Sequence, residues 1–216
     1  PEAKLLAKRF LLEQRMGQLA TGKAAWMKAV KEDGRIHGYV NHNGAVTGRC
    51  THSGPNMAQV PRVSSLYGKE CRSLFIAKPG YKMVGCDAKG LELRCLAHYV
   101  ARYDDGAYGK VVCEGDPHTT NQKAAGLATR DHAKTFIYAL LYGAGDAKLG
   151  RIVDPKATEA AARQIGRTLR SRFMRNFPAY AALKNGLDAR LACAILEGQS
   201  TSIIKGIDGR PLHIRS

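Results

Sequence analysis

Residues 130–145 read RDHAKTFIYALLYGAG, and this stretch decides how the rest of the chain is interpreted. Arg130, Lys134, Tyr138 and Tyr142 stand in it at four-residue intervals. Four residues overshoot one turn of an α-helix by only about 40°, so the four side chains share one stripe. The spacing predicts a helix from about residue 130 to residue 142.

This predicted helix has a cationic, aromatic front and an apolar back, because Ala133, Phe136 and Leu140 point away from the stripe. A triphosphate needs positive donors, and the sugar and base behind it need flat surfaces. Two cations followed by two phenols therefore suit a nucleotide. An ordinary amphipathic helix with a solvated charged face gives the same pattern, so other motifs have to decide between the two.

A second motif, YKMVGCDAKGLELRCLAH, covers residues 81–98. A short apolar run ends there at Asp87, and a helical pattern begins near Gly90. A carboxylate at the end of a strand, with the carbonyl of Ala88, offers the hard oxygen ligands that Mg²⁺ prefers. An aspartate in this position is also a common helix cap or turn former. Glu92 follows one turn later on the same side.

Three blocks in order make the chain resemble family A DNA polymerases, and more closely the replicative polymerases of short-tailed phages. Residues 34–59, GRIHGYVNHNGAVTGRCTHSGPNMAQ, resemble the primer-template block; residues 87–94 resemble motif A; residues 130–143 resemble motif B. The resemblance runs from about Gly34 to Ser216. It implies a DNA-directed DNA polymerase, a nucleotidyltransferase that adds deoxynucleotides to a primer 3′ end during viral DNA replication. The implied fold class is α+β, a partial right-hand polymerase fold with a palm sheet and a mostly helical fingers subdomain.

The resemblance also implies catalytic roles. Asp87 resembles one of the two metal-binding aspartates of the palm, and Ala88 would contribute its backbone carbonyl. The expected cofactor is Mg²⁺, as two ions that activate the primer 3′-hydroxyl and hold the triphosphate. Lys134 would stabilise charge on the phosphates and could protonate the leaving group.

By the same resemblance, six residues contact the incoming nucleotide: Glu92, His118, Arg130, Lys134, Tyr138 and Tyr142. Glu92 resembles a steric gate that, with Tyr138, fills the space of a ribose 2′-hydroxyl. His118, in the segment DPHTT, resembles part of the set that grips the triphosphate together with Arg130 and Lys134. Tyr142 resembles the tyrosine of the insertion site, beside the templating base.

The resemblance assigns DNA contacts as well. Arg49, Asn56 and Gln59 resemble contacts to the primer-template. The second catalytic aspartate of the family lies in a later block, a His-Asp-Glu or similar tripeptide, which does not occur in this sequence. Since the chain also begins with Pro1, we expect an internal fragment that is inactive in isolation.

Composition agrees with a polyanionic partner. The chain has 34 Lys and Arg against 18 Asp and Glu, a formal net charge of +16, and a pI of about 9.8. Such an excess favours nucleic acid through phosphate contacts. The expected partners are primer-template DNA and deoxynucleoside triphosphates. A processivity factor is left open as a further partner, and no membrane association is expected. No apolar run reaches the roughly 18 residues of a membrane span, and no signal peptide is recognised, so we expect a cytoplasmic protein, in the host cell if the gene is viral.

The organisation expected along the chain follows its glycines and prolines. The expected domains are the end of the thumb helices at 1–33, the palm at 34–110, the fingers at 111–200 and the start of a return to the palm at 201–216. The expected elements are helices over 3–31 with a break near Thr21-Gly22, a hairpin at 35–49 turning at Asn43-Gly44, strands near 72–77 and 81–87, a helix at 90–103, a helix beginning at Pro117, helices at 156–175 and 179–197, and a hairpin at 201–215 around Asp208-Gly209.

Two other functions remain open at this point. A single-subunit RNA polymerase shares the spacing of Arg130, Lys134 and the Tyr-Gly pair, although a bulky acid at Glu92 would oppose ribonucleotides. A non-catalytic nucleic-acid-binding module would explain the charge but not the ordered stripe. The arginines at 163, 167, 170, 172 and 175 are also left open, because a solvated helix face explains them as well as a binding role.

Overall fold

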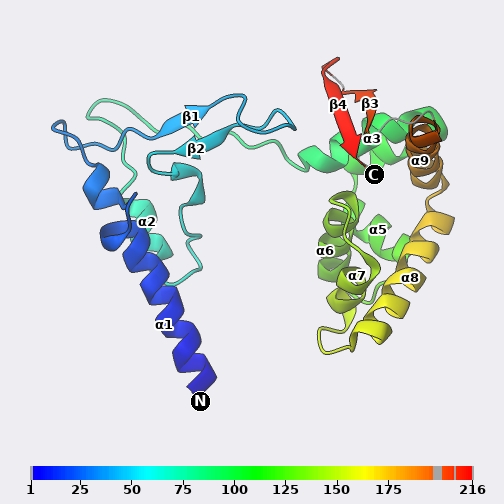
Figure 1. Ribbon diagram of the computed structural model, residues 1–216, viewed down its shortest axis with the longest axis horizontal. Coiled ribbons are helices and arrows are strands. Elements are labelled where there is room, and N and C mark those ends of the chain that lie inside the picture. The colour runs from blue at the N-terminus through cyan, green and yellow to red at the C-terminus, as the bar shows by residue number, and fades with distance from the viewer. Residues whose placement is uncertain (1, 197–200, 207, 216) are drawn as a thin grey trace. The chain divides into compact units, whose positions relative to one another are not determined.

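The computed structural model describes residues 2–196, 201–206 and 208–215 (Figure 1). The chain divides into two compact units, Pro1–Gly85 and Cys86–Ser216. Both contain helices and one two-stranded antiparallel sheet, so the α+β class is confirmed for the described residues.

The first unit begins with the expected broken helical segment. Helix α1 spans Glu2–Met16 and passes into a π-helical turn, Gly17–Thr21, before a short 3-10 helix at Trp26–Ala29. The amide of Gly22 donates to the carbonyl of Gly17 at 2.9 Å, which closes the turn at the predicted break. Trp26 is buried and packs edge-on against Phe75, with ring centroids 5.7 Å apart.

The hairpin of the first unit forms, but its second strand lies later than predicted. Strand β1 spans Tyr39–Asn41 and pairs with β2, Thr51–Ser53. The connection occupies residues 42–50 because it contains two successive turns. The side chain of Asn41 accepts from the amide of Asn43 at 3.1 Å, and a second turn follows, in which Gly48 has a positive φ of 79°.

The strands predicted at 72–77 and 81–87 are wrong. Helix α2 covers Gly68–Ser73, and residues 74–88 belong to neither sheet. The apolar run that suggested a strand is exposed, with Tyr81 at 75% and Val84 at 92% of full exposure. A strand needs a neighbour to satisfy its backbone N–H and C=O groups, and the described residues provide none for this segment.

The second unit is a helical assembly with a small sheet at its C-terminal end (Figure 1). Its elements are α3 (Leu91–Asp104), α4 (Ala107–Glu114), α5 (Pro117–Ala125), α6 (Arg130–Leu141), α7 (Asp146–Val153), α8 (Glu159–Asn176), α9 (Pro178–Leu196), β3 (Thr201–Lys205) and β4 (Pro211–Arg215). The predicted helices at α3, α5, α6, α8 and α9 and the final hairpin are confirmed. The sequence did not predict α4 and α7, which are each about two turns long and follow Gly106 and Gly145.

One hydrophobic core joins the helices of the second unit. Phe136 of α6 and Phe173 of α8 are fully buried, with ring centroids 5.6 Å apart. Val100 of α3 and Leu149 of α7 are fully buried in the same cluster. Burying side chains of this size contributes about 1.5–3 kcal/mol each, so the packing fixes α6 from behind and leaves its front exposed.

Both ends of α6 are closed by specific hydrogen bonds. The Thr129 hydroxyl accepts from the amide of His132 at 3.1 Å and caps the first turn. At the other end Gly143 takes a positive φ of 75°, and the amide of Ala144 donates to the carbonyl of Ala139 at 2.9 Å. This is a Schellman motif, which glycine favours because it has no Cβ. The predicted end of the helix near residue 142 is confirmed.

Within the described residues, every helix is too short or too polar to span a membrane.

Candidate nucleotide-binding face

The front of α6 carries the four residues that the spacing had aligned. Arg130, Lys134 and Tyr142 are exposed, and Tyr138 is half-buried. The three residues predicted for the opposite side, Ala133, Phe136 and Leu140, are all buried. The two-faced helix is therefore confirmed.

Arg130 is held by a carboxylate on the neighbouring helix. Its Nε donates to Oδ2 of Asp116 at 2.8 Å, and its Nη2 donates to Oδ1 at 3.0 Å. The same carboxylate caps α5, since it accepts from the amide of His118 at 3.1 Å and from the hydroxyl of Thr119 at 2.7 Å. The Arg130 guanidinium, helped by Thr119, lowers the pKa of the Asp116 carboxyl far below its usual value. Asp116 thus stays ionised and fixes the direction of Arg130.

His118 lies close to Tyr138 and within the influence of the charges of Arg130 and Lys134. Its ring centroid is 6.2 Å from that of Tyr138. Partial burial, followed by the charges of Arg130 and Lys134, lowers the pKa of His118 and outweighs the opposite effect of Asp116. His118 Nδ1 is buried without a hydrogen-bond partner among the described residues. The lowered pKa favours the neutral ring, which can offer an N–H donor without adding a full charge.

Glu92 joins this face from helix α3. Its Oε1 accepts from the Tyr142 hydroxyl at 3.2 Å, across fifty residues of sequence. Glu92 also acts on Tyr138: burial is the main cause that raises the pKa of the Tyr138 hydroxyl, and the Glu92 charge is the second. We refer to Glu92, His118, Arg130, Lys134, Tyr138 and Tyr142 together as the candidate nucleotide-binding face.

Asp87 and Ala88 lie just before α3, in exposed backbone without regular structure. Together they offer one carboxylate and one carbonyl oxygen. Within the described residues, no group of three or more His, Cys, Asp or Glu side chains could hold a metal ion. Mg²⁺ commonly takes only one or two protein carboxylates and completes its shell with water and substrate phosphates. These two residues therefore fit part of a magnesium site.

The expected DNA contacts belong to the first unit, around its hairpin. Arg49 precedes β2 and is exposed. Asn56 caps the 3-10 helix Met57–Gln59, where its side-chain oxygen accepts from the amide of Ala58 at 3.0 Å. Gln59 ends this turn with an exposed side chain. The three residues thus lie on short connections that follow one another in sequence.

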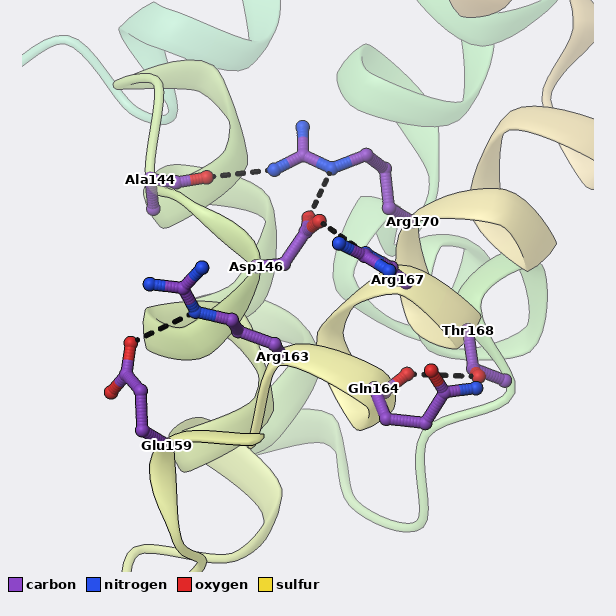
Figure 2. Close-up of polar contacts among 8 residues, drawn as sticks. All are labelled: Ala144, Asp146, Glu159, Arg163, Gln164, Arg167, Thr168 and Arg170. Carbon is purple, nitrogen blue, oxygen red and sulfur yellow. Dashed lines mark hydrogen bonds and ion pairs between the residues drawn. The ribbon is translucent and has the colours of Figure 1, made fainter. Parts of the chain in front are cut away.

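The loop after α6 is tied to α8 by a pair of arginines. Figure 2 shows Asp146 between Arg167 and Arg170. Arg170 Nε donates to Asp146 Oδ1 at 2.8 Å, and its Nη2 donates to the carbonyl of Ala144 at 2.8 Å. Arg167 Nε is 3.6 Å from Asp146 Oδ2. Arg170 therefore connects the residues that follow Gly143 to the long helix behind them.

Comparison with known proteins identifies the chain. The sequence model of DNA polymerase family A matches residues 8–185. The chain belongs to this family. A DNA-directed DNA polymerase of Enterobacteria phage T3 and one of Escherichia phage T7 are each 47% identical to it over 98% of the chain. The expected family A resemblance, with phage polymerases among the relatives, is confirmed.

The solved structures agree on the fold of this family A chain. It matches the structure described as the POL domain of Pol1 from M. smegmatis in complex with DNA primer-template and dNTP, with a TM-score of 0.62 and 22% identity. The match covers 87% of this chain and 32% of that one. The chain likewise spans 31% of the length of the T3 and T7 polymerases.

Sequence reasoning missed one residue of the candidate site, Asp116. A signal was present, since an aspartate directly before a proline in the first turn of a helix is a typical N-cap. The cap predicts where α5 starts. It does not predict that the same carboxylate binds Arg130, because that contact depends on how α5 packs against α6.

Proposed function

We propose that this chain forms the nucleotide-binding part of a template-directed DNA polymerase, which transfers a deoxynucleotide to a primer 3′ end. The observation that carries the proposal is the assembly of two cations, a histidine, two phenols and an acid on one side of the second unit. These six residues come from α3, α5, α6 and the C-cap of α6, Tyr142. Family membership and the phage relatives support the same reaction class.

The cations would bind the triphosphate. Arg130 has five N–H donors, of which the two bonds to Asp116 use two, so three remain for phosphate oxygens. Lys134 stands one turn further along the exposed front. Phosphoryl transfer depends mainly on positioning and charge stabilisation, which fixed cations supply. Lys134 would also donate a proton to the departing pyrophosphate, and His118 an N–H bond to a phosphate oxygen.

Asp87 and the Ala88 carbonyl would hold Mg²⁺, of which two ions are expected. Such ions lower the pKa of an attacking hydroxyl and neutralise charge on the triphosphate. The task left to this chain is to orient the phosphates against Asp87.

The sugar would lie against Glu92 and the two tyrosines. The Glu92 carboxylate accepts from the Tyr142 hydroxyl, and its charge contributes, after burial, to the raised pKa of the Tyr138 hydroxyl. A ribose 2′-hydroxyl would meet an acid whose position is already fixed. This favours a DNA polymerase over an RNA polymerase, and the ordered face favours an enzyme over a simple DNA-binding module.

The primer-template would contact Arg49, Asn56 and Gln59 in the first unit. The net charge of +16 supports a nucleic-acid partner. A processivity factor remains part of the proposal by analogy with replicative relatives. Because the two relatives at 47% identity come from phages, we propose that the reaction takes place in the host cytoplasm.

We further propose that the chain alone does not polymerise. Asp87 is one carboxylate, and two Mg²⁺ ions beside a triphosphate need a second one to hold their positions. The second aspartate would have to come from outside this sequence.

The test is a chimera in which this chain replaces its counterpart in the T7 phage polymerase. Primer extension is measured with deoxynucleotides and with ribonucleotides, beside the isolated 216-residue chain. We expect template-directed extension by the chimera with deoxynucleotides and none by the chain. A folded chimera that binds primer-template without extending it would contradict the proposed function.

A further inference from the structure

Helix α8 has an exposed face, and none of its residues belongs to the candidate nucleotide-binding face. Its buried side consists of Ala162, Gly166, Leu169 and Phe173. On the opposite side, six exposed polar residues form a band that covers about 140° of the helix circumference. We call them the outer stripe: Gln164, Arg167, Thr168, Ser171, Arg172 and Arg175. Together they line one shallow hollow of about 350 Å³.

The arginines of α8 fall into two groups by their partners. Arg163 and Arg170, which flank the stripe, form ion pairs with Glu159 at 3.1 Å and with Asp146 at 2.8 Å (Figure 2). The stripe itself contains no carboxylate. Its Arg167 is 68% exposed and only loosely placed near Asp146, at 3.6 Å.

The other two stripe arginines have no acidic partner within the described residues. Arg172 Nη1 makes one long contact, 3.5 Å, to the carbonyl of Gly126. Arg175 is exposed at the end of the helix. The guanidinium groups of Arg172 and Arg175 therefore keep an uncompensated charge on the exposed side of the helix, next to Ser171.

We propose that the outer stripe binds the sugar-phosphate backbone of duplex DNA without reading its sequence. Guanidinium groups match phosphate oxygens, which they bind with two parallel hydrogen bonds. Arg167 and Arg175 are eight residues apart, about 12 Å along the helix, roughly the axial length of three to four phosphates in one strand of B-DNA. The stripe thus fits a run of backbone phosphates.

The side chains of the stripe select duplex over single-stranded DNA. Surfaces for single strands combine positive charge with aromatic rings on which bases stack. None of the six stripe residues is aromatic or apolar. Contacts limited to phosphates position a duplex without giving specificity. The inference rests on the proposed function only in taking DNA as the polyanion.

The test uses the 216-residue chain and a blunt duplex of about 30 base pairs, with binding followed by fluorescence anisotropy over a range of salt concentrations. The variant Arg172→Gln/Arg175→Gln removes two stripe charges. The matched control Arg151→Gln/Arg163→Gln removes two charges from α7 and α8 that are both paired with Glu159.

For the stripe variant we expect roughly tenfold weaker binding at low salt, and a slope of log affinity against log salt that is smaller by about 1.8. The control should stay within about twofold of the unmodified chain. Arg175→Gln alone, in an exposed position without an ion pair, should reduce the slope by about 0.9. Circular dichroism checks that each variant is folded.

Equal losses in the stripe variant and the control would overturn the proposal, because net charge alone would then explain binding. Tighter binding of a single strand than of the duplex, or displacement of the duplex by polyglutamate at equal charge, would also overturn it. These results are separate from nucleotide incorporation by the chimera. An unchanged slope of log affinity against log salt in the stripe variant would contradict DNA binding by the outer stripe, but it would not contradict the proposed function.

Discussion

The hydroxyl of Tyr142 donates a 3.2 Å hydrogen bond to Oε1 of Glu92, and so joins the end of α6 to the first turn of α3. Two motifs that are fifty residues apart thereby meet at one point. The bond limits the positions that the acid can take, and an acid in a fixed position excludes a hydroxyl more sharply than one that can move aside.

Replacing Glu92 with alanine in the chimera should relax sugar selection. Without the carboxylate, a ribose 2′-hydroxyl finds open space, and we expect ribonucleotide use relative to deoxynucleotide use to rise by tenfold or more, about 1.4 kcal/mol. Tyr142→Phe removes the hydrogen bond but keeps the acid, so it should change the ratio less. Ratios from competitive single-nucleotide incorporation measure this. An unchanged ratio in Glu92→Ala would show that another residue selects the sugar.

The protonation of His118 gives a pH-dependent prediction. Its pKa in the folded chain lies below the ordinary value of 6.5, mainly because of burial and then Arg130. Between the folded pKa and pH 6.5, His118 therefore binds fewer protons in the folded state than in the unfolded state. The free energy of unfolding falls as the pH is lowered through this range. NMR titration should find the lowered value, and Lys134→Met should raise it. A His118 pKa at or above 6.5 would contradict the described environment.

The sequence predicts α6 and its two faces because the evidence is local. Four-residue spacing and the Thr129 and Gly143 caps lie within one segment, and helices depend on contacts between near neighbours. The strand predicted at 81–87 is different. Its apolar run has strand character, but a strand forms only beside a partner, which no local pattern reveals.

The candidate site shows the same limit. Resemblance names Arg130, His118 and Glu92, yet the bonds that orient two of them, to Asp116 and to Tyr142, join different helices. Which carboxylate meets which donor depends on packing. The functional roles of all the predicted site residues stay predictions: Asp87, Ala88, Glu92, His118, Arg130, Lys134, Tyr138, Tyr142, Arg49, Asn56 and Gln59.

Asp116 should stabilise α5 in two separable ways. Asp116→Asn keeps a side-chain oxygen for the cap and loses the charge that binds Arg130, whereas Asp116→Ala loses both. We expect the alanine variant to melt at a lower temperature than the asparagine variant, with the unmodified chain highest. Because the pKa of Asp116 is lowered in the folded state, the stabilisation by its negative charge is present above pH 3.8. This stabilisation is lost as the pH falls below 3.8. Equal melting temperatures for the two variants would contradict the capping role.

Gly166 should be required where α8 crosses α7. A Cβ built there would lie 1.9 Å from the carbonyl oxygen of Asp146, so the backbone of one helix has to move. We expect Gly166→Ala to destabilise the chain by about 1–3 kcal/mol in denaturant unfolding. Gly186→Ala, also inside a helix, is the control: its Cβ would meet only the Tyr103 hydroxyl at 3.7 Å, and alanine should be neutral or stabilising there. Similar losses in both variants would contradict the close approach.

The most direct test of the central claim, that the front of α6 binds the triphosphate, is the rate of single-nucleotide incorporation by the chimera carrying Lys134→Met. The comparison is Lys148→Met, which removes an exposed lysine from α7. We predict a loss of roughly 100-fold for Lys134→Met, about 2.7 kcal/mol of transition-state stabilisation, with primer-template affinity almost unchanged, and less than a twofold loss for Lys148→Met. Incorporation by Lys134→Met within about threefold of the unmodified chimera, a difference below 1 kcal/mol, would contradict the account.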